Sequence, residues 1–178
     1  CRDKDVAFVA MTYYNLIFRY GLEGFAKKCN EVGISGIIVP DLPVEESDDL
    51  KRCCRKYDID LIYLIAPTTS DKRIGMIIKN SSGFIYLVSL LGVTGARDTL
   101  GGHVKGLIKR IKGRTKMPVC LGFGISKSKH VKRAIDYGAD GVIVGSAIID
   151  LIEKNRKNKN KMLKELERFV RDLKAATR

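Results

Sequence analysis

The sequence has little of several features that would point to a function directly. It has no tryptophan and only two histidines, and no apolar run reaches the ~18 residues that a membrane-spanning helix needs. No basic segment followed by an apolar one precedes a small-residue cleavage site, as an export signal would require. We therefore expect a soluble cytoplasmic protein that contacts no membrane.

Metal and redox sites are not indicated either. The five cysteines are Cys1, Cys29, Cys53, Cys54 and Cys120. They show no paired spacing of the metal-binding or redox kind, and adjacent Cys53 and Cys54 cannot easily bridge each other. His103 and His130 fall at or in predicted outer helices, where a histidine is usually a surface residue. We expect reduced thiols, no metal ion and no histidine catalyst.

The net charge of +13 raises the question of nucleic-acid binding, because clustered lysines and arginines bind phosphates. However, the basic residues fall on the polar faces of predicted helices and in the junction at 154–161. No aromatic residues that could stack on bases are interleaved with them. We interpret them as a solvated exterior and expect no nucleic-acid partner.

Six apolar runs are predicted to be strands, and helical patterns alternate with them. The strands are expected at 5–11, 36–40, 61–67, 84–88, 119–121 and 142–144. Helices are expected at 21–31, 44–57, 103–112, between the last two strands, at 146–153 and around 162–173, and one more is expected to be capped by Ser70 and to end at Lys79. Because each strand is apolar on both faces, the pattern predicts a parallel sheet covered by helices.

An internal repeat indicates which parallel fold this is. VGISGIIVP at 32–40 matches YGADGVIVG at 137–145 position for position, an offset of 105 residues, or four steps of roughly 26 residues each, the size of a βα unit. A doubly wound sheet has its glycine turn after the first strand, whereas here the glycine turns come last. We therefore predict an α/β fold, the (β/α)8 TIM barrel. Residues 1–178 would form a single, N-terminally incomplete barrel domain with strands three to eight, and about 60 residues of a ~250-residue barrel would precede Cys1.

The glycine turns follow the last two predicted strands, at 122–124 and 145–146. Each exposes backbone N–H groups, and a helix N-terminus follows, so together they predict an anion-binding cup that suits a phosphate ester. The loop at 89–102 is long and has glycine at four positions, which predicts a lid. From the residues alone, Asp41 suits a turn as well as a reacting acid, and Tyr86 is more typical of a core.

Seven motifs in order carry a family resemblance: MTYYN, IFRYG, VPDLPVEES, APTTSDKRI, YLVSLLGVTGARD, GFGIS and GADGVIVGSAII. Over essentially the whole chain they resemble the α subunit of tryptophan synthase. The resemblance implies a lyase that cleaves indole-3-glycerol phosphate to indole and glyceraldehyde 3-phosphate by a retro-aldol reaction in tryptophan biosynthesis. It also implies an α2β2 complex with a β subunit that holds pyridoxal phosphate, and no cofactor in the α subunit.

The resemblance implies roles for individual residues of this sequence. The substrate phosphate would be held by Gly95, Gly124, Gly145 and Ser146. The indole pocket would be lined by Tyr13, Ile38, Leu64, Phe123 and Ile143. Tyr86 would lie near the glycerol and indole part of the substrate, and Thr94 belongs to the lid that closes over the catalytic acid. Asn15 and Asp41 match positions on the face that meets the β subunit.

The resemblance also implies a proton-transferring glutamate on the family's second strand and an aspartate in the following loop. We expect both upstream of Cys1, and we expect this chain alone to have little or no cleavage activity. Another phosphate-binding barrel of histidine or tryptophan biosynthesis fits less well, because it would need more acids or a lysine at the strand ends. A non-catalytic, phosphate-binding or regulatory barrel module that docks on a partner remains the alternative.

Overall fold

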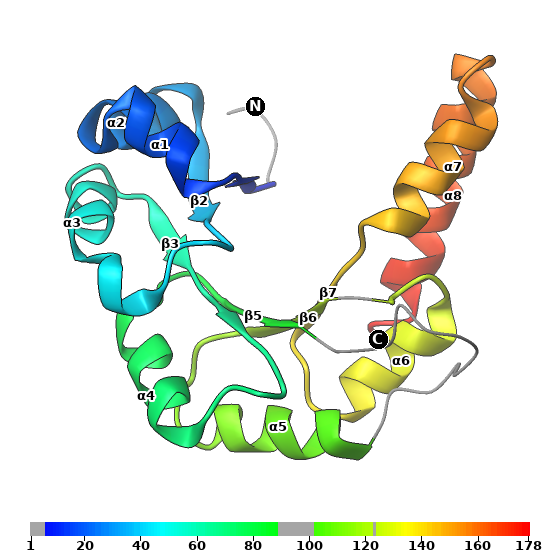
Figure 1. The fold of residues 1–178 in the computed structure, drawn as a ribbon. Coiled ribbons are helices and arrows are strands. Elements are labelled where there is room, and N and C mark those ends of the chain that lie inside the picture. Colours follow the sequence, from blue (N-terminus) through cyan, green and yellow to red (C-terminus); the bar gives the residue numbers. More distant parts are fainter. Residues whose placement is uncertain (1–5, 89–101, 123) are drawn as a thin grey trace. The chain divides into compact units, whose positions relative to one another are not determined.

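The structure, a computed structural model, describes residues 6–88, 102–122 and 124–178. The chain forms two compact units: Cys1–Ile65 with Thr69–Tyr86, and Ala66–Thr68 with Leu87–Arg178. In both units strands alternate with helices, as the ribbon in Figure 1 shows. The strand pairs β1–β2, β2–β3 and β6–β7 run parallel. The predicted α/β class with parallel strands is therefore confirmed.

Unit 1 contains the three-stranded sheet β1-β2-β3, the strand β4, the start of β5 and the helices between these strands. Its elements are β1 (Phe8–Met11), α1 (Tyr14–Tyr20), α2 (Leu22–Val32), β2 (Ile34–Ile38), the 3-10 helix η1 (Val44–Glu46), α3 (Asp48–Lys56), β3 (Asp60–Ile62), β4 (Leu64–Ile65), α4 (Asp71–Asn80) and the start of β5 (Ile85–Val88). The first sheet has the order β1-β2-β3, with Ile37 of β2 between Ala10 and Leu61. Leu50 and Cys54 are four residues apart on α3, so they share one helix face, and both are buried.

β1 differs from the expectation that every strand is buried on both faces. Phe8, Val9 and Met11 are 42%, 40% and 54% exposed. In the part of the chain that the structure describes, β1 is an edge strand of its sheet and pairs with β2. An edge strand keeps one row of backbone N–H and C=O groups without a neighbour in its sheet.

The apolar run at 61–67 was predicted as one strand but forms two, β3 and β4, with Tyr63 between them. The residues before Tyr63 pair with β2, whereas the carbonyl of Tyr63 accepts a hydrogen bond from the Tyr86 N–H of β5 at 3.1 Å. The run therefore divides where its hydrogen-bonding partner changes. The prediction of six strands was wrong on this point, since the described residues contain seven.

Unit 2 contains the C-terminal strands and the helices that follow β5. Its elements are α5 (Gly102–Lys112), β6 (Val119–Gly122), α6 (Ser128–Asp136), β7 (Gly141–Ile143), α7 (Ser146–Asn155) and α8 (Lys159–Ala175). α7 and α8 lie side by side (Figure 1). Ile125, Val131 and Leu173 form a buried cluster against which Val142 and Phe169 pack, so the second half of α8 is part of the core.

The internal repeat is confirmed in the backbone. Gly33 and Gly138 each lie between a helix and a strand, with φ of +83° and +96°. In this left-handed region glycine avoids the clash that a Cβ atom would cause. Both residues can therefore end a helix and turn the chain toward the next strand. β2 and β7 follow them, as the matching sequences predicted. In the described ranges, no helix has both the length and the hydropathy to cross a membrane.

Candidate functional site

The turns after β6 and β7 lie at the same edge of their sheet. Gly122 of β6 pairs with Ile143 of β7 in parallel register, so the residues that follow both strands leave the sheet side by side. Gly124 is exposed and has a φ of +74°, a conformation that favours glycine. Ile143 is partly buried at the end of β7. The two predicted glycine turns therefore do lie next to each other.

The second turn opens directly into α7. Gly145 is the residue before the helix and Ser146 the first residue in it, and both are exposed. The N–H groups of Ile148 and Ile149 donate back to the carbonyl of Gly145, at 2.9 and 3.3 Å. The N–H groups of Ser146 and Ala147 have no acceptor among the described residues.

The start of α7 therefore suits an anion. The first turn of the helix contains no acidic residue, so nothing there opposes the partial positive charge of the helix N-terminus. A Cβ atom built on Gly145 would meet nothing within 4 Å. Its φ of −118° lies outside the left-handed region, so the missing side chain leaves open space rather than permitting a left-handed turn.

Three predicted pocket residues of unit 1 lie at or near the ends of its strands. Ile38 ends β2 and is 5% exposed, and Leu64 is a partly buried residue of β4. Tyr86 of β5 is 8% exposed, and burial raises the pKa of its phenol, so it is a neutral hydroxyl at pH 7. These side chains offer apolar surface with one phenol O–H.

Tyr13 is placed differently. It lies immediately before α1 and is 64% exposed, in contrast to the buried Ile38 and Tyr86. Thr94, Gly95 and Phe123, which were predicted for the lid, the phosphate and the pocket, lie outside the described residues. Of the predicted pocket residues, Ile38 and Tyr86 are therefore buried, whereas Tyr13 is exposed.

Asp41 and Asn15 lie on segments that are hydrogen-bonded together. The N–H of Tyr14 donates to both carboxylate oxygens of Asp41, at 2.9 and 3.2 Å. Tyr14 is the first residue of α1, whose N–H has no acceptor within the helix, and Asn15 is the second. The two residues predicted for a partner-facing surface are therefore neighbours in space. This contact also explains why α1, which was not predicted, begins here.

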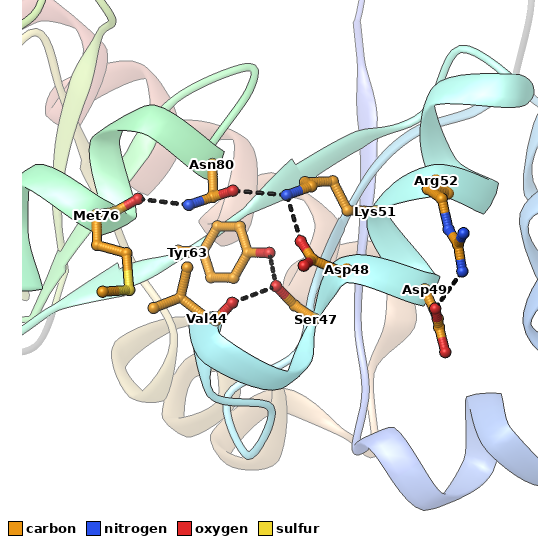
Figure 2. A network of polar contacts seen from close by, with 9 residues as sticks. All are labelled: Val44, Ser47, Asp48, Asp49, Lys51, Arg52, Tyr63, Met76 and Asn80. Atoms are coloured by element: carbon orange, nitrogen blue, oxygen red, sulfur yellow. Dashed lines mark hydrogen bonds and ion pairs between the residues drawn. The ribbon is translucent and has the colours of Figure 1, made fainter.

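A buried polar network near Asp41 was missed by sequence reasoning. The Tyr63 hydroxyl donates to Ser47 Oγ, which in turn donates to the carbonyl of Val44 at 2.8 Å (Figure 2). Beside it, Lys51 Nζ contacts Asp48 and Asn80, each at 2.6 Å. The sequence SDD at 47–49 points to an ordinary helix start, and nothing in it shows that the serine faces inward.

A pocket of about 240 Å³ lies in unit 1 near the start of β3, next to the contact between Lys51 and Asn80. It is lined mainly by polar side chains, among them Lys51, Arg55, Asp60 and Asn80. None of the predicted site residues lines it. It is therefore separate from the strand ends that carry the candidate site.

Among residues 6–88, 102–122 and 124–178, no group of three or more His, Cys, Asp or Glu side chains could hold a metal ion. Cys29, Cys53, Cys54 and Cys120 are free thiols. His103 and His130 lie on α5 and α6, as predicted, and His130 Nδ1 accepts a hydrogen bond from the Ser126 N–H at 3.3 Å.

Comparison with known proteins gives one consistent result. The family described as tryptophan synthase alpha chain matches residues 1–178. The tryptophan synthase alpha chain of Methanocaldococcus jannaschii is 52% identical over 168 residues, which is 94% of this chain and 59% of that protein. The one from Methanosarcina acetivorans is 50% identical over 96% of this chain and 61% of that protein. The chain thus spans about three fifths of the length of these relatives.

A solved structure agrees with the sequence relatives. A chain of the tryptophan synthase α2β2 complex from Pyrococcus furiosus is similar with a TM-score of 0.88 and 36% identity, over 98% of this chain and 69% of that one.

Proposed function

The chain belongs to the tryptophan synthase alpha chain family, and on that basis we propose that the protein is a carbon–carbon lyase that cleaves indole-3-glycerol phosphate to indole and glyceraldehyde 3-phosphate. The observation that carries the proposal is the match of the family to all 178 residues. The proposal includes a (β/α)8 barrel in one domain, in which this chain forms strands three to eight and β3 and β4 together count as one strand.

The phosphate of the substrate binds at the two glycine turns of unit 2 in this proposal. Gly124, Gly145 and Ser146 contribute to the site, and Gly95 joins them. Two features support this assignment: the acceptor-free N–H groups of Ser146 and Ala147, and the lack of a carboxylate in the first turn of α7. The open space at Gly145 lets a phosphate oxygen approach the backbone closely.

The indole and glycerol parts would contact apolar side chains and one phenol. Ile38, Leu64 and Ile143, with Tyr13 and Phe123, are proposed for the indole ring, and Tyr86 for the glycerol region. Burial favours the neutral form of Tyr86, which can donate a hydrogen bond to a substrate hydroxyl. Thr94 is proposed to act in a lid that excludes water from the reacting bonds.

A β subunit that carries pyridoxal phosphate is the proposed partner, and this subunit would need no cofactor of its own. Asn15 and Asp41 are proposed to face that partner, which fits their position on two exposed, hydrogen-bonded segments. The reaction needs one proton delivered to the indole ring and one removed from a glycerol hydroxyl. The resemblance assigns neither task to a residue of this chain, so we propose that residues 1–178 alone release little indole.

The test compares indole release by residues 1–178 with that of the longest reading frame that contains them. We expect indole only from the longer protein. Gly145→Ala in that protein should raise the KM for indole-3-glycerol phosphate at least about tenfold, the loss that one charged hydrogen bond causes. Gly75→Ala, in an exposed and open position of α4, is the matched control and should leave the KM unchanged.

Each other outcome has a definite meaning. No indole from the longer protein, together with intact binding of glyceraldehyde 3-phosphate, would favour the non-catalytic phosphate-binding module. An unchanged KM in Gly145→Ala would remove the phosphate assignment while leaving the lyase proposal in place.

A further inference from the structure

Ser47 is the one polar residue with a fully buried side chain among those that the structure describes, at 0% exposure. It lies between η1 and α3, where a serine usually accepts a hydrogen bond from one of the first N–H groups of the following helix. Ser47 makes no such bond. Its hydroxyl turns inward, accepts the Tyr63 O–H and donates to the carbonyl of Val44 (Figure 2). The Ser47 side chain therefore connects η1 to Tyr63, which lies between β3 and β4, and does not cap α3.

The segment that this bond holds is the loop after β2, residues 39–47. Leu42 and Val44 are buried within it, so its apolar side chains already face the core. On the outer side, the Glu45 carboxylate pairs with Arg73 of α4 at 3.0 Å. The loop is therefore fixed from inside by Ser47 and Tyr63 and from outside by Glu45.

The two residues of the buried hydrogen bond each lie close in the chain to a residue with a proposed function. Asp41 lies in the held loop, and its carboxylate receives the Tyr14 N–H. Tyr63 directly precedes Leu64, and its carbonyl receives the N–H of Tyr86. The Tyr63 to Ser47 hydrogen bond is thus a direct link between the strand segment of the proposed pocket and the loop of the proposed partner surface.

We propose that Ser47 and Tyr63 are positioning residues, whose buried hydrogen bond holds the loop after β2 so that Asp41 meets the N-terminus of α1. The partner-facing role of Asp41 rests on the proposed function. The placement of Asp41 does not, and it can be measured separately. Ser47→Ala leaves the buried Tyr63 O–H without its acceptor and the Val44 carbonyl without the Ser47 donor, whereas Tyr63→Phe leaves Ser47 Oγ with only its bond to Val44. Both changes remove the bond that ties the loop to Tyr63, which favours movement of the loop.

Hydrogen exchange of the Tyr14 amide reports this placement directly. As the first N–H of α1 it has no acceptor in the helix, so its protection depends on Asp41. Asp41→Ala sets the unprotected limit. We expect Tyr63→Phe and Ser47→Ala each to speed this exchange at least about tenfold, as loss of an ordinary hydrogen bond would, while the amides of β2 keep their protection. The double variant should add nothing to the larger single effect, because both changes break the same bond.

Tyr57→Phe is the matched control. It removes a tyrosine hydroxyl in the same unit, one that donates to Glu23 at 2.9 Å on the surface, and should leave Tyr14 unchanged. Should Tyr63→Phe fail to fold, Ser47→Ala and Ser47→Cys carry the test. Unchanged Tyr14 exchange in the folded variants, or an equal rise in Tyr57→Phe, would overturn the positioning role.

The second measurement is the binding of a β subunit to the protein encoded by the longest reading frame that contains residues 1–178. We expect Tyr63→Phe to weaken it and Tyr57→Phe to leave it unchanged. If Tyr14 responds as expected but the unaltered protein binds no β subunit, the positioning role stands and the proposed partner fails. If binding occurs but is equal in Tyr63→Phe and in the unaltered protein, the link from this bond to the partner surface is refuted.

Discussion

Asp140 joins three elements of unit 2, and its removal gives a sharp test of the packing described above. Its carboxylate lies just before β7, receives Lys112 Nζ of α5 at 2.7 Å and accepts the Val119 N–H of β6 at 2.8 Å. Burial by itself would raise the pKa of Asp140, but the hydrogen bonds from Lys112 and Val119 outweigh it and lower the pKa. The ionised carboxylate therefore stabilises the fold.

The two contacts of Asp140 differ in expected strength. A charged hydrogen bond to a backbone N–H contributes about 1.5–3 kcal/mol, and the lower end applies because the carboxylate is 39% exposed. The ion pair with Lys112 is half-exposed and contributes about 0.2–1 kcal/mol. Asp140→Ala should thus cost about 2 kcal/mol and lower the Tm by about 4–8 °C. Lys112→Ala loses only the ion pair and should lower the Tm by less than about 4 °C.

Thermal unfolding followed by circular dichroism at several pH values measures both effects. Because the folded pKa of Asp140 lies below its ordinary value of 3.8, its contribution is complete above that pH and is lost as the pH falls through the folded pKa. The difference between the unaltered chain and Asp140→Ala should therefore close in strong acid. Equal costs for Asp140→Ala and Lys112→Ala at pH 7, or a difference that persists in strong acid, would refute this account.

Two further predictions concern single residues. Gly124→Ala places a Cβ atom at a φ of +74° and should cost about 1–2 kcal/mol in urea unfolding, so an unchanged midpoint would contradict the left-handed turn. Burial, with smaller contributions from Cys53 and Cys29, raises the pKa of the Cys54 thiol to about 12. Alkylation at pH 8 followed by peptide mapping should therefore label half-exposed Cys53 well before Cys54, and equal rates would show that Cys54 is accessible.

Much of the fold could be predicted because the deciding residues are local. Ser70 was expected to cap a helix, and its side chain does accept the Arg73 N–H at the start of α4. The two matching segments of the repeat were expected to contain strands at 36–40 and 142–144, and β2 and β7 overlap these ranges. In these cases the sequence neighbours of a residue determine its conformation, so the pattern is sufficient.

The differences arise where a distant residue decides. α1 begins at Tyr14 because Asp41, 27 residues later, receives its N–H. The apolar run at 61–67 divides because Tyr63 takes its partner from β5. The predicted helix at 44–57 is interrupted at Ser47, whose hydroxyl faces Tyr63 instead of the helix start. No pattern within one segment contains this information.

Some residues of the candidate site could likewise be predicted from the sequence around them, and others could not. The glycine turns could be found because each follows its own strand, and their common edge follows from parallel pairing. Tyr13, by contrast, closely follows an apolar run in the sequence, and only the structure shows that it is mostly exposed.

The exposed edge strand β1 has a consequence for how copies of the chain behave in concentrated solution. Among residues 6–88, 102–122 and 124–178, β1 pairs on one side only, and an edge of this kind with exposed Phe8, Val9 and Met11 can associate with the edge of another copy. The net charge of +13 opposes such association, because copies of the same charge repel one another. Salt shortens that repulsion to about 8 Å at physiological ionic strength. We therefore expect the positive charge to oppose association of residues 1–178 through this edge, and to protect least where the salt concentration is highest.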